Sequence, residues 1–231
     1  MRPGERPEIA NLPLFREMQD RQRDRIFSGS FLQVFPPQLT LFELGQYPDF
    51  LHVLVDGLVE LYAHSAGRDT TMRIVEPVTS FILAAVVTDQ PYLMSARTLV
   101  SSRILLVPAA LVREVVKDDP ALMQATMREL AHAYRDMVRA LTDMKLRQSA
   151  ERLGNLILRQ DRRQGGTGSV LLKAEKRLLA SLLGMTPENL SRAFGVLTGH
   201  GITVSGPNVT ITDRAALEAF SRPDPVRDDL V

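Results

Sequence analysis

The spacing of apolar and polar residues changes along the chain, and up to about Val107 it has the short period of β-strands. The stretch over 49–77 contains apolar runs separated by turn residues at Asp56-Gly57 and at Ser65-Ala66-Gly67-Arg68. An Asp-Gly pair between β-branched runs predicts a β-hairpin. Short strands with turns about every dozen residues predict an antiparallel roll or barrel, preceded by short amphipathic helices over 12–27.

Two further apolar segments complete this first region. The residues from Phe81 to Val87 are all apolar, so periodicity does not separate a buried strand from a short buried helix. The segment from Ser101 to Pro108 predicts another strand, which ends at its proline.

A long helix follows these strands. Asp118-Asp119-Pro120 combines a capping aspartate with a proline in the first turn, and neither glycine nor proline occurs again before Gly154. Apolar residues then recur at alternating spacings of four and three, at Met123, Met127, Leu130, Tyr134, Met137, Leu141 and Met144. A period of about 3.5 residues is typical of a seam between two helices, whereas a helix packed on its own domain usually shows a wider stripe. The pattern favours a homodimer interface, and packing on the chain's own strands is the alternative.

The pattern changes again at about Gln148. A helix over 149–160, a polar glycine-rich loop over 161–169 and a helix ended by Gly184 come first. Thr186 then caps a helix that has Pro187 in its first position and ends near Gly199. Strands over 202–204 and 209–211 form a hairpin, and Asp213 caps a last helix before a loose tail over 221–231.

Two helices joined by a glycine-containing turn and followed by a β-hairpin predict a winged helix-turn-helix. The sequence therefore predicts an α+β protein in three parts. An N-terminal antiparallel β-roll forms a sensor domain over 1–118, a dimerisation helix spans 119–147, and a C-terminal winged helix-turn-helix domain for DNA binding spans 148–231.

The second helix of this motif begins with polar side chains. Glu188, Ser191 and Arg192 share one face within about one turn, and this end of the helix enters the major groove of double-stranded DNA in a winged helix. Glutamate accepts a hydrogen bond from cytosine N4, and arginine donates two to guanine. Thr186 and Asn189 join them as predicted DNA-binding residues. The alternative is an exposed ion pair between Glu188 and Arg192 with no ligand.

Composition narrows the choice of function. The net charge of +1 gives no global field, although the stretch from Arg139 to Arg177 has ten Lys/Arg against four Asp/Glu, an excess of six positive charges. No cysteine is present, which excludes disulfides and a cysteine-ligated iron–sulfur cluster. There is no signal peptide and no apolar run of about 20 residues, so we expect a cytoplasmic protein without a membrane partner. No phosphate loop, nucleophile elbow or zinc-protease motif occurs, which argues against an enzyme.

In this order, the roll, the long helix and the winged helix resemble the CRP/FNR superfamily of bacterial transcription regulators. The segment Glu188-Asn189-Leu190-Ser191-Arg192 resembles the E-x-x-S-R motif of the FNR type, and the segment over 55–62, VDGLVELY, resembles the roll signature. The resemblance implies a homodimer that binds a palindromic TTGAT-like site and acts with RNA polymerase. It also implies an effector in the roll that changes the packing of the long helices.

The predicted effector region departs from the cyclic-nucleotide-binding members of that superfamily. Those members hold the ribose through a Gly-Glu-Leu motif and the phosphate through an Arg-Ser pair. Here Leu83 and Ala84 occupy the first position, Met94 and Ser95 occupy the second, and Arg97 is out of register on the other face of its strand. A charged nucleotide would lack a partner for its phosphate, so cyclic AMP is not expected.

An apolar sensor is the remaining expectation. The chain is similar to nitric-oxide-responsive denitrification regulators, a resemblance that implies haem, and the histidines are the candidate axial ligands: His52, His64, His132 and His200. The alternative for each of them is an ordinary structural or surface histidine. A regulator that is controlled by its abundance, without a ligand, stays open. So does a protein-interaction module that uses the heptad helix.

Overall fold

In a computed structural model that describes residues 6–65 and 67–228, the chain divides into two compact units, Met1–Tyr134 and Arg135–Val231. The division falls within one long helix, α5 (Pro120–Leu146). Each unit has its own buried core, so each is described separately below.

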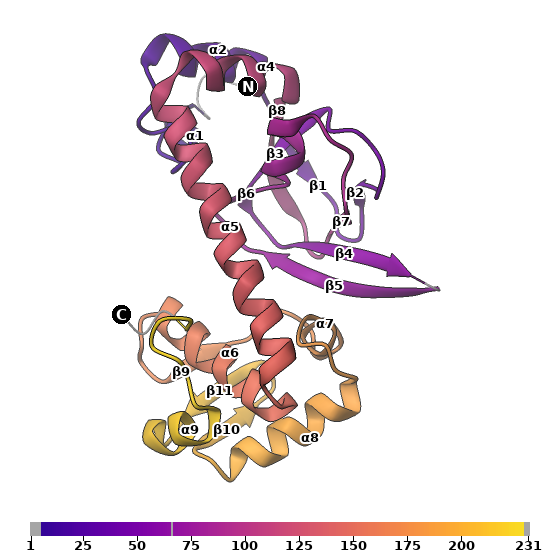
Figure 1. Cartoon of the computed structure of the whole chain (residues 1–231), viewed down its shortest axis with the longest axis vertical. Helices are drawn as coiled ribbons and strands as arrows, with labels where there is room; N and C mark the ends of the chain where they lie inside the picture. Colours follow the sequence, from indigo (N-terminus) through magenta and orange to yellow (C-terminus); the bar gives the residue numbers. More distant parts are fainter. Residues whose placement is uncertain (1–5, 66, 229–231) are drawn as a thin grey trace. The chain divides into compact units, whose positions relative to one another are not determined.

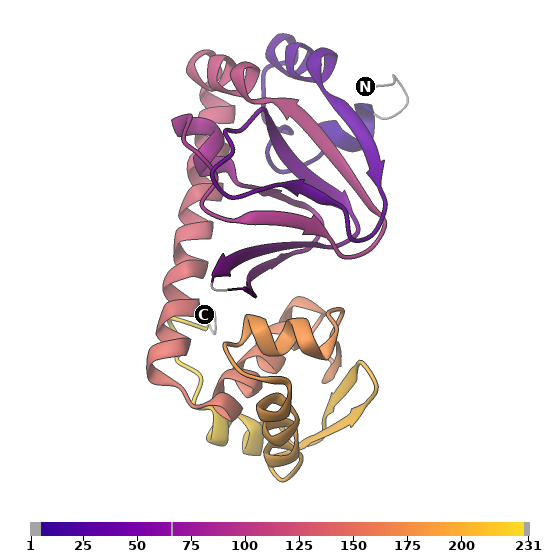
Figure 2. The same cartoon turned by 90° about the vertical axis from the view of Figure 1, so that its right-hand side faces the viewer.

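The first unit contains two four-stranded antiparallel sheets (Figures 1 and 2). One sheet has the order β1-β8-β3-β6 and the other has the order β2-β7-β4-β5. The strands are β1 (Phe31–Phe35), β2 (Thr40–Phe42), β3 (Phe50–Asp56), β4 (Val59–Ser65), β5 (Arg68–Val75), β6 (Thr79–Phe81), β7 (Ser95–Thr98) and β8 (Ser102–Pro108). The helices are α1 (Arg6–Ala10), α2 (Asp20–Gly29), α3 (Leu83–Thr88) and α4 (Ala109–Asp118). The predicted β-roll is therefore confirmed.

The hairpin predicted at Asp56-Gly57 is wrong. β3 pairs with β6 and β8 in one sheet, whereas β4 pairs with β5 and β7 in the other, so the chain crosses between sheets at this point. Gly57 has a φ of +103°, and a Cβ there would lie 2.3 Å from the Ser102 hydroxyl oxygen. The glycine thus permits a close approach between two strand ends rather than a tight turn.

The second predicted turn does close a hairpin. β4 and β5 pair from Val59↔Val75 to Ser65↔Arg68, and Ala66 lies outside the described residues. The apolar run over 81–87, for which a strand and a helix were both open, contains the end of one and the start of the other. β6 ends at Phe81, and α3 begins at Leu83. Ile82 between them has a φ of +60°, which breaks the strand before the helix begins.

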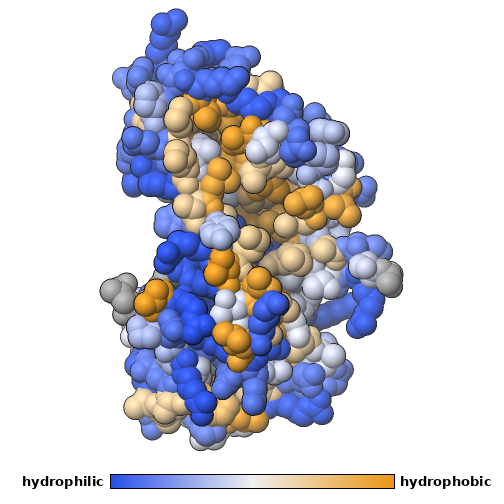
Figure 3. All heavy atoms as spheres, viewed as in Figure 1, coloured by the Kyte–Doolittle hydropathy of each residue, from blue (hydrophilic) through white to orange (hydrophobic). Residues whose placement is uncertain are grey.

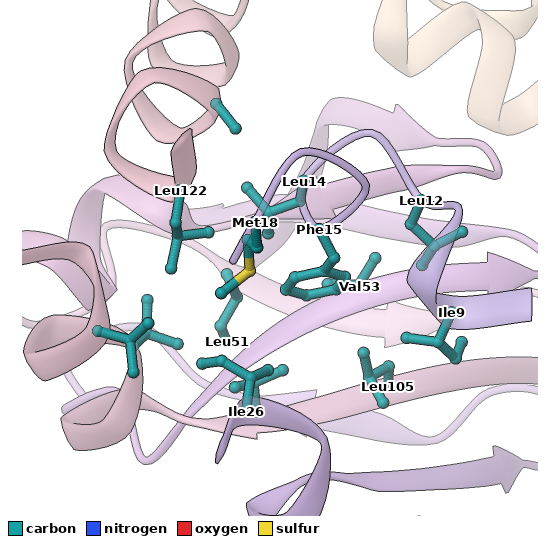
Figure 4. Packing of buried hydrophobic residues seen from close by; sticks show 14 of the residues in the cluster. Ile9, Leu12, Leu14, Phe15, Met18, Ile26, Leu51, Val53, Leu105 and Leu122 are labelled. Atoms are coloured by element: carbon teal, nitrogen blue, oxygen red, sulfur yellow. The ribbon is translucent and has the colours of Figure 1, made fainter. Parts of the chain in front are cut away.

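A core of aliphatic and aromatic side chains packs the helices against the β3–β8 sheet. Ile26 of α2, Leu51 of β3 and Leu105 of β8 are fully buried in it, and Figure 4 shows Leu122 pointing from the first turn of α5 toward Met18. The start of α5 is fixed as predicted, because the buried Asp119 carboxylate accepts the backbone N–H of Leu122 at 2.9 Å. The same carboxylate accepts the N–H of Gln19 at 3.0 Å, which ties α5 to the N-terminal segment.

The apolar stripe of α5 is largely uncovered in the single chain. Six of its seven members are 41–64 % exposed, and Figure 3 shows apolar side chains along the course of α5. The exception is Leu130, which is half-buried against the core of the first unit. The alternative in which the stripe packs on the chain's own strands therefore holds for one residue and not for the other six. The exposed members are Met123, Met127, Tyr134, Met137, Leu141 and Met144.

The second unit is a winged helix-turn-helix, as predicted. Its helices are α6 (Ser149–Arg163), α7 (Lys176–Leu182), α8 (Pro187–Thr198) and α9 (Arg214–Ser221). Its strands β9 (Ser169–Leu171), β10 (Ile202–Ser205) and β11 (Asn208–Ile211) form a sheet in the order β10-β11-β9. Sequence patterning missed β9, because three residues behind a glycine-rich loop are too few to show a period. α6 also runs three residues further into the predicted loop, to Arg163.

The C-terminal tail is not loose up to residue 228, which corrects the prediction. Asp228 is 2 % exposed, and its carboxylate accepts two hydrogen bonds from Arg147, at 2.5 and 3.0 Å. Arg139 donates to the carbonyl of Arg227 at 2.6 Å, and Arg162 donates to the carbonyl of Asp228 at 2.7 Å. A short polar segment without periodicity is thus held by arginines that are distant in the sequence.

Candidate nucleic-acid interface and sensor region

α8 begins with a capping threonine that follows a left-handed glycine. Gly184, after α7, has a φ of +61°, a conformation that glycine adopts without strain. Thr186 then accepts the backbone N–H of Asn189 at 3.2 Å through its hydroxyl, and Pro187 occupies the first helical position. The predicted capping role of Thr186 is confirmed, and its side chain is committed to the helix end.

The polar side chains of α8 face solvent together. Glu188, Ser191 and Arg192 are exposed, and Asn189 is half-buried. The guanidinium of Arg192 donates to Oδ1 of Asn189, and among the described residues no ion pair joins it to Glu188. Arg192 is therefore hydrogen-bonded to Asn189 rather than to Glu188.

Glu188 is held in its charged form. Its hydrogen bond with the Thr186 hydroxyl is the largest cause of a lowered pKa, followed by a backbone N–H at the helix start and by the attraction of Arg192. A carboxylate at this position is a hydrogen-bond acceptor at neutral pH, which is the state that reads the amino group of a base.

The opposite face of α8 anchors it in the domain core. Leu190, Ala193, Phe194 and Leu197 are buried in the cluster that also contains residues of α6, α9 and the sheet. Lys176 of α7 lies with its ammonium group 5.9 Å from the centre of the Phe194 ring. The buried face thus fixes which side chains α8 presents outward.

Some of the arginines in the positively charged stretch from Arg139 to Arg177 are paired with carboxylates inside the second unit. Arg147 and Arg159 form ion pairs with Asp143 and Asp228, at distances of 2.5–3.2 Å. Burial opposes ionisation of the Asp228 carboxyl, but hydrogen bonds from Arg147 hold its pKa below the ordinary value. These arginines stabilise the corner between α5 and α6 and do not form a free basic patch.

The four predicted effector residues do not converge on one space. Leu83 is buried in the core beneath the helices, whereas Ala84 beside it is exposed. Met94 packs on the other core of the roll, between the sheets. Ser95 is buried, and its hydroxyl accepts the backbone N–H of Leu44 at 3.0 Å.

Arg97 follows the buried Ala96 on β7, so its side chain leaves the opposite face of the strand. Its Nε donates to the carboxylate of Glu60 at 2.7 Å, and a terminal nitrogen donates to Asp69 at 3.0 Å. Glu60 is 1 % exposed and also accepts the hydroxyl of Thr71 at 2.6 Å. The charge of Arg97 is therefore already neutralised by the chain's own carboxylates.

His52 is the histidine inside the roll. It is 6 % exposed, and its ring centre lies 5.3 Å from the centres of both Phe42 and Phe81. Its Nδ1 has no hydrogen-bond partner. Burial, only partly offset by a hydrogen bond with the backbone of Phe50, lowers its pKa from 6.5 to about 4, so it is neutral at physiological pH.

The other three histidines lie elsewhere. His64 is exposed and bonds to Asp69 through Nδ1 at 2.8 Å, while His132 is exposed on α5. His200 stacks on Phe220 in the winged helix, with ring centres 4.2 Å apart. In the part of the chain that the structure describes, no group of three or more potential metal ligands comes together, and no helix is long and apolar enough to cross a membrane.

Comparison with known families gives one match in each of the two units. Residues 32–119 match the cyclic nucleotide-binding domain, and residues 151–220 match the Crp-like helix-turn-helix domain. The second match covers α6 to α9 with the outward face of α8. The chain thus combines a cyclic nucleotide-binding-like domain with a Crp-like helix-turn-helix domain, the domain pair of a DNA-binding transcription regulator.

Solved structures give the particular fold. A protein from Ruegeria pomeroyi described as cyclic nucleotide binding is 24 % identical with a TM-score of 0.61, over 96 % of this chain and 100 % of that one. FixK2 from Bradyrhizobium japonicum is 19 % identical with a TM-score of 0.74, over 82 % and 96 %. A CooA variant from Carboxydothermus hydrogenoformans is 15 % identical with a TM-score of 0.74, over 85 % and 89 %.

The chain therefore has the domain pair and the fold of the Crp/Fnr family of DNA-binding transcription regulators. No curated protein sequence matches it.

Proposed function

We propose that this protein is a homodimeric regulator that binds a palindromic TTGAT-like DNA site through α8, in the cytoplasm, and thereby controls RNA polymerase at nearby promoters. The outward face of α8 is the observation that carries the proposal. Glu188, Ser191 and Arg192 are exposed on it, and the buried face leaves this orientation no freedom. Glu188 would accept from cytosine and Arg192 would donate to guanine within each half-site.

The exposed stripe of α5 supports the dimer. Six apolar side chains at heptad spacing are uncovered in a single chain, and a partner helix would bury them. A two-fold dimer would place two copies of α8 about 34 Å apart, which is the separation of successive major grooves on one side of the duplex.

A binding experiment with three proteins tests the proposal. We expect Arg192→Ala to weaken binding to a TTGAT-type palindrome at least about tenfold, because it removes a bidentate base contact of about 1–3 kcal/mol from each of the two half-sites. Fluorescence anisotropy with labelled duplexes measures this loss. Arg21→Ala is the matched control, because Arg21 is exposed on α2 in the first unit and its loss removes the same charge. An Arg192→Ala protein that binds the palindrome as tightly as the wild type would refute the site.

We also propose that a cyclic nucleotide does not control this regulator. Arg97 is engaged by Glu60 and Asp69, while Ala84 and Met94 offer no charge to a ribose phosphate. Bringing an anion into such surroundings without a partner is unfavourable. A small uncharged effector is more compatible with the roll, because the Nδ1 of His52 is a buried hydrogen-bonding atom with no partner.

The residues do not fit a haem. An axial histidine must approach the iron to about 2 Å, yet the His52 ring is packed between Phe42 and Phe81. His64 and His132 are exposed and His200 lies in the winged helix, so none of them is in an apolar pocket of the roll. Purified protein mixed with haem should therefore show no sharp Soret band that shifts with nitric oxide. Such a band would reverse this conclusion.

A further inference from the structure

One glycine of α8 has no reason to be a glycine within the described chain. Gly195 is a helical residue, nine positions into α8, and glycine has the lowest helix propensity of any residue except proline. A Cβ built at Gly195 meets no atom within 4 Å, so no neighbouring side chain or strand requires the space. Its φ is not positive, so the backbone at Gly195 is not in the left-handed region that favours glycine. Neither packing nor backbone geometry accounts for it.

Two other glycines of the second unit do have such reasons. Gly154 of α6 would place a Cβ 2.0 Å from the hydroxyl oxygen of Ser221, and Gly201 would place one 2.2 Å from the carbonyl oxygen of Asp213. In those two positions the second unit itself fills the space of a side chain. At Gly195 that space is open to solvent.

Gly195 lies at the centre of the outward face of α8. At about 100° per residue, it is within about 20° of Glu188 around the helix axis, two turns further along. Arg192 lies between them on the same face, and the four buried residues of α8 lie on the opposite side. Gly199 continues the line one turn later, so the second half of this face carries no side chain along its centre.

We propose that Gly195 is a close-approach position, at which the backbone of α8 lies directly against the DNA. The inference rests on the proposed function of α8. The absence of a side chain at Gly195 would let the helix axis sit deep in the major groove, so that Glu188 and Arg192 reach the base edges. Gly195 is therefore a positioning residue: it contacts the duplex by its backbone and sets the reach of the two side chains that read sequence.

Substitutions that separate size from helix propensity test this proposal. Alanine and leucine are both better helix formers than glycine, so Gly195→Ala and Gly195→Leu should raise the thermal unfolding midpoint of the full chain by a few degrees. Both should nevertheless weaken binding to the TTGAT-type palindrome, by about tenfold or more for alanine and further for leucine, because the loss follows side-chain size. Differential scanning fluorimetry and anisotropy on the same samples give the two readouts.

Coupling to the base-reading residue gives an independent readout. If Gly195 acts by letting Arg192 reach its base, then Gly195→Ala should cost little extra affinity in an Arg192→Ala background. Fully additive losses would overturn the positioning role.

Each remaining outcome is decisive. Gly195→Ala and Gly195→Leu proteins that bind as tightly as the wild type would overturn the proposal, and so would a lowered unfolding midpoint, which would show that the glycine serves packing within the chain. A wild type that fails to bind the palindrome would instead contradict the proposed function itself.

Discussion

At the scale of single residues, the most unusual environment is that of His52. The folded chain keeps its imidazole neutral down to about pH 4, whereas an unfolded chain binds the proton at about 6.5. The unfolded state therefore holds more protons between these values, so the stability that His52 contributes is complete above about pH 6.5 and is lost as the pH falls toward 4. Burial of an unpartnered ring nitrogen thus makes the roll sensitive to mild acid.

This environment gives a quantitative prediction. The free energy of unfolding of the wild type should fall by about 2 kcal/mol between pH 7 and pH 5 because of this residue alone. In His52→Leu that component should be absent, because leucine does not titrate. Urea denaturation at both pH values measures the difference, with His132→Gln as a control because His132 is exposed on α5. Equal pH dependence in His52→Leu and the wild type would contradict the neutral, buried assignment.

Asp228 gives a second prediction at this scale. Asp228→Asn removes the charge that faces Arg147 and Arg159, while Asp143 still neutralises part of their charge. We expect the free energy of unfolding of the second unit to fall by about 2 kcal/mol, somewhat less than the loss of a whole buried ion pair. Glu218→Gln on α9 is the matched control, because Glu218 is 39 % exposed and makes a longer 3.6 Å contact with Arg214. Equal losses in the two variants would show that the tail is not specifically held.

Single residues were predictable where the cause is local. The caps at Asp119, Thr186 and Asp213 each act on a backbone N–H three residues away, and all three are confirmed. Asp228 could not be predicted, because its partner Arg147 lies 81 residues earlier in the chain. Nor does the sequence show that the pocket residues Leu83 and Met94 pack into different cores.

At the scale of elements, α5 makes the sharpest prediction. Leu141→Lys places a charge in the exposed stripe and should convert a dimer to a monomer, since two lysines would meet in an apolar seam. Leu141 is the better choice than Leu130, because Leu130 also packs on the core of its own unit. Size-exclusion chromatography with light scattering measures the mass.

His132→Lys is the control for this experiment. His132 is exposed on the side of α5 away from the stripe, so the added charge should leave the dimer intact. A dimeric Leu141→Lys protein would exclude the stripe as the seam.

Element type followed from periodicity, whereas strand pairing did not. The helices from α5 to α8 were placed by apolar spacing and caps to within a few residues. The hairpin at Asp56-Gly57 was wrong because local turn chemistry gives the bend but not the sheet that each strand enters. Strand β9 was missed because its three residues gain their order from pairing with β11.

At the scale of the whole molecule, the order of the parts was predictable because each has its own sequence period. The strands alternate, α5 keeps a heptad spacing, and the winged helix has capped amphipathic helices. The surroundings of the predicted effector residues in the first unit were predictable only in part. Ala84 and Met94 were visible in the sequence, but the ion pairs of Glu60 and Asp69 with Arg97 depend on three strands, β4, β5 and β7, meeting in one sheet.

The contacts of Arg97 with Glu60 and Asp69 predict how the full chain responds to a cyclic nucleotide. The first unit matches a cyclic nucleotide-binding domain, yet its Arg97 is already held by two carboxylates, one of them 1 % exposed. To bind a phosphate, Arg97 would have to break its ion pair with Glu60. The Glu60 carboxylate would then be a buried unpaired charge, at a cost of several kcal/mol. We therefore expect that millimolar cyclic AMP or cyclic GMP changes neither the unfolding temperature of the full chain nor its affinity for the palindromic duplex.

Glu60→Gln is the informative variant, because it weakens the hold on Arg97 without adding bulk. A nucleotide response in Glu60→Gln alone would show that this ion pair closes the site, whereas a response in the wild type would show that the domain still senses a nucleotide and would overturn the prediction.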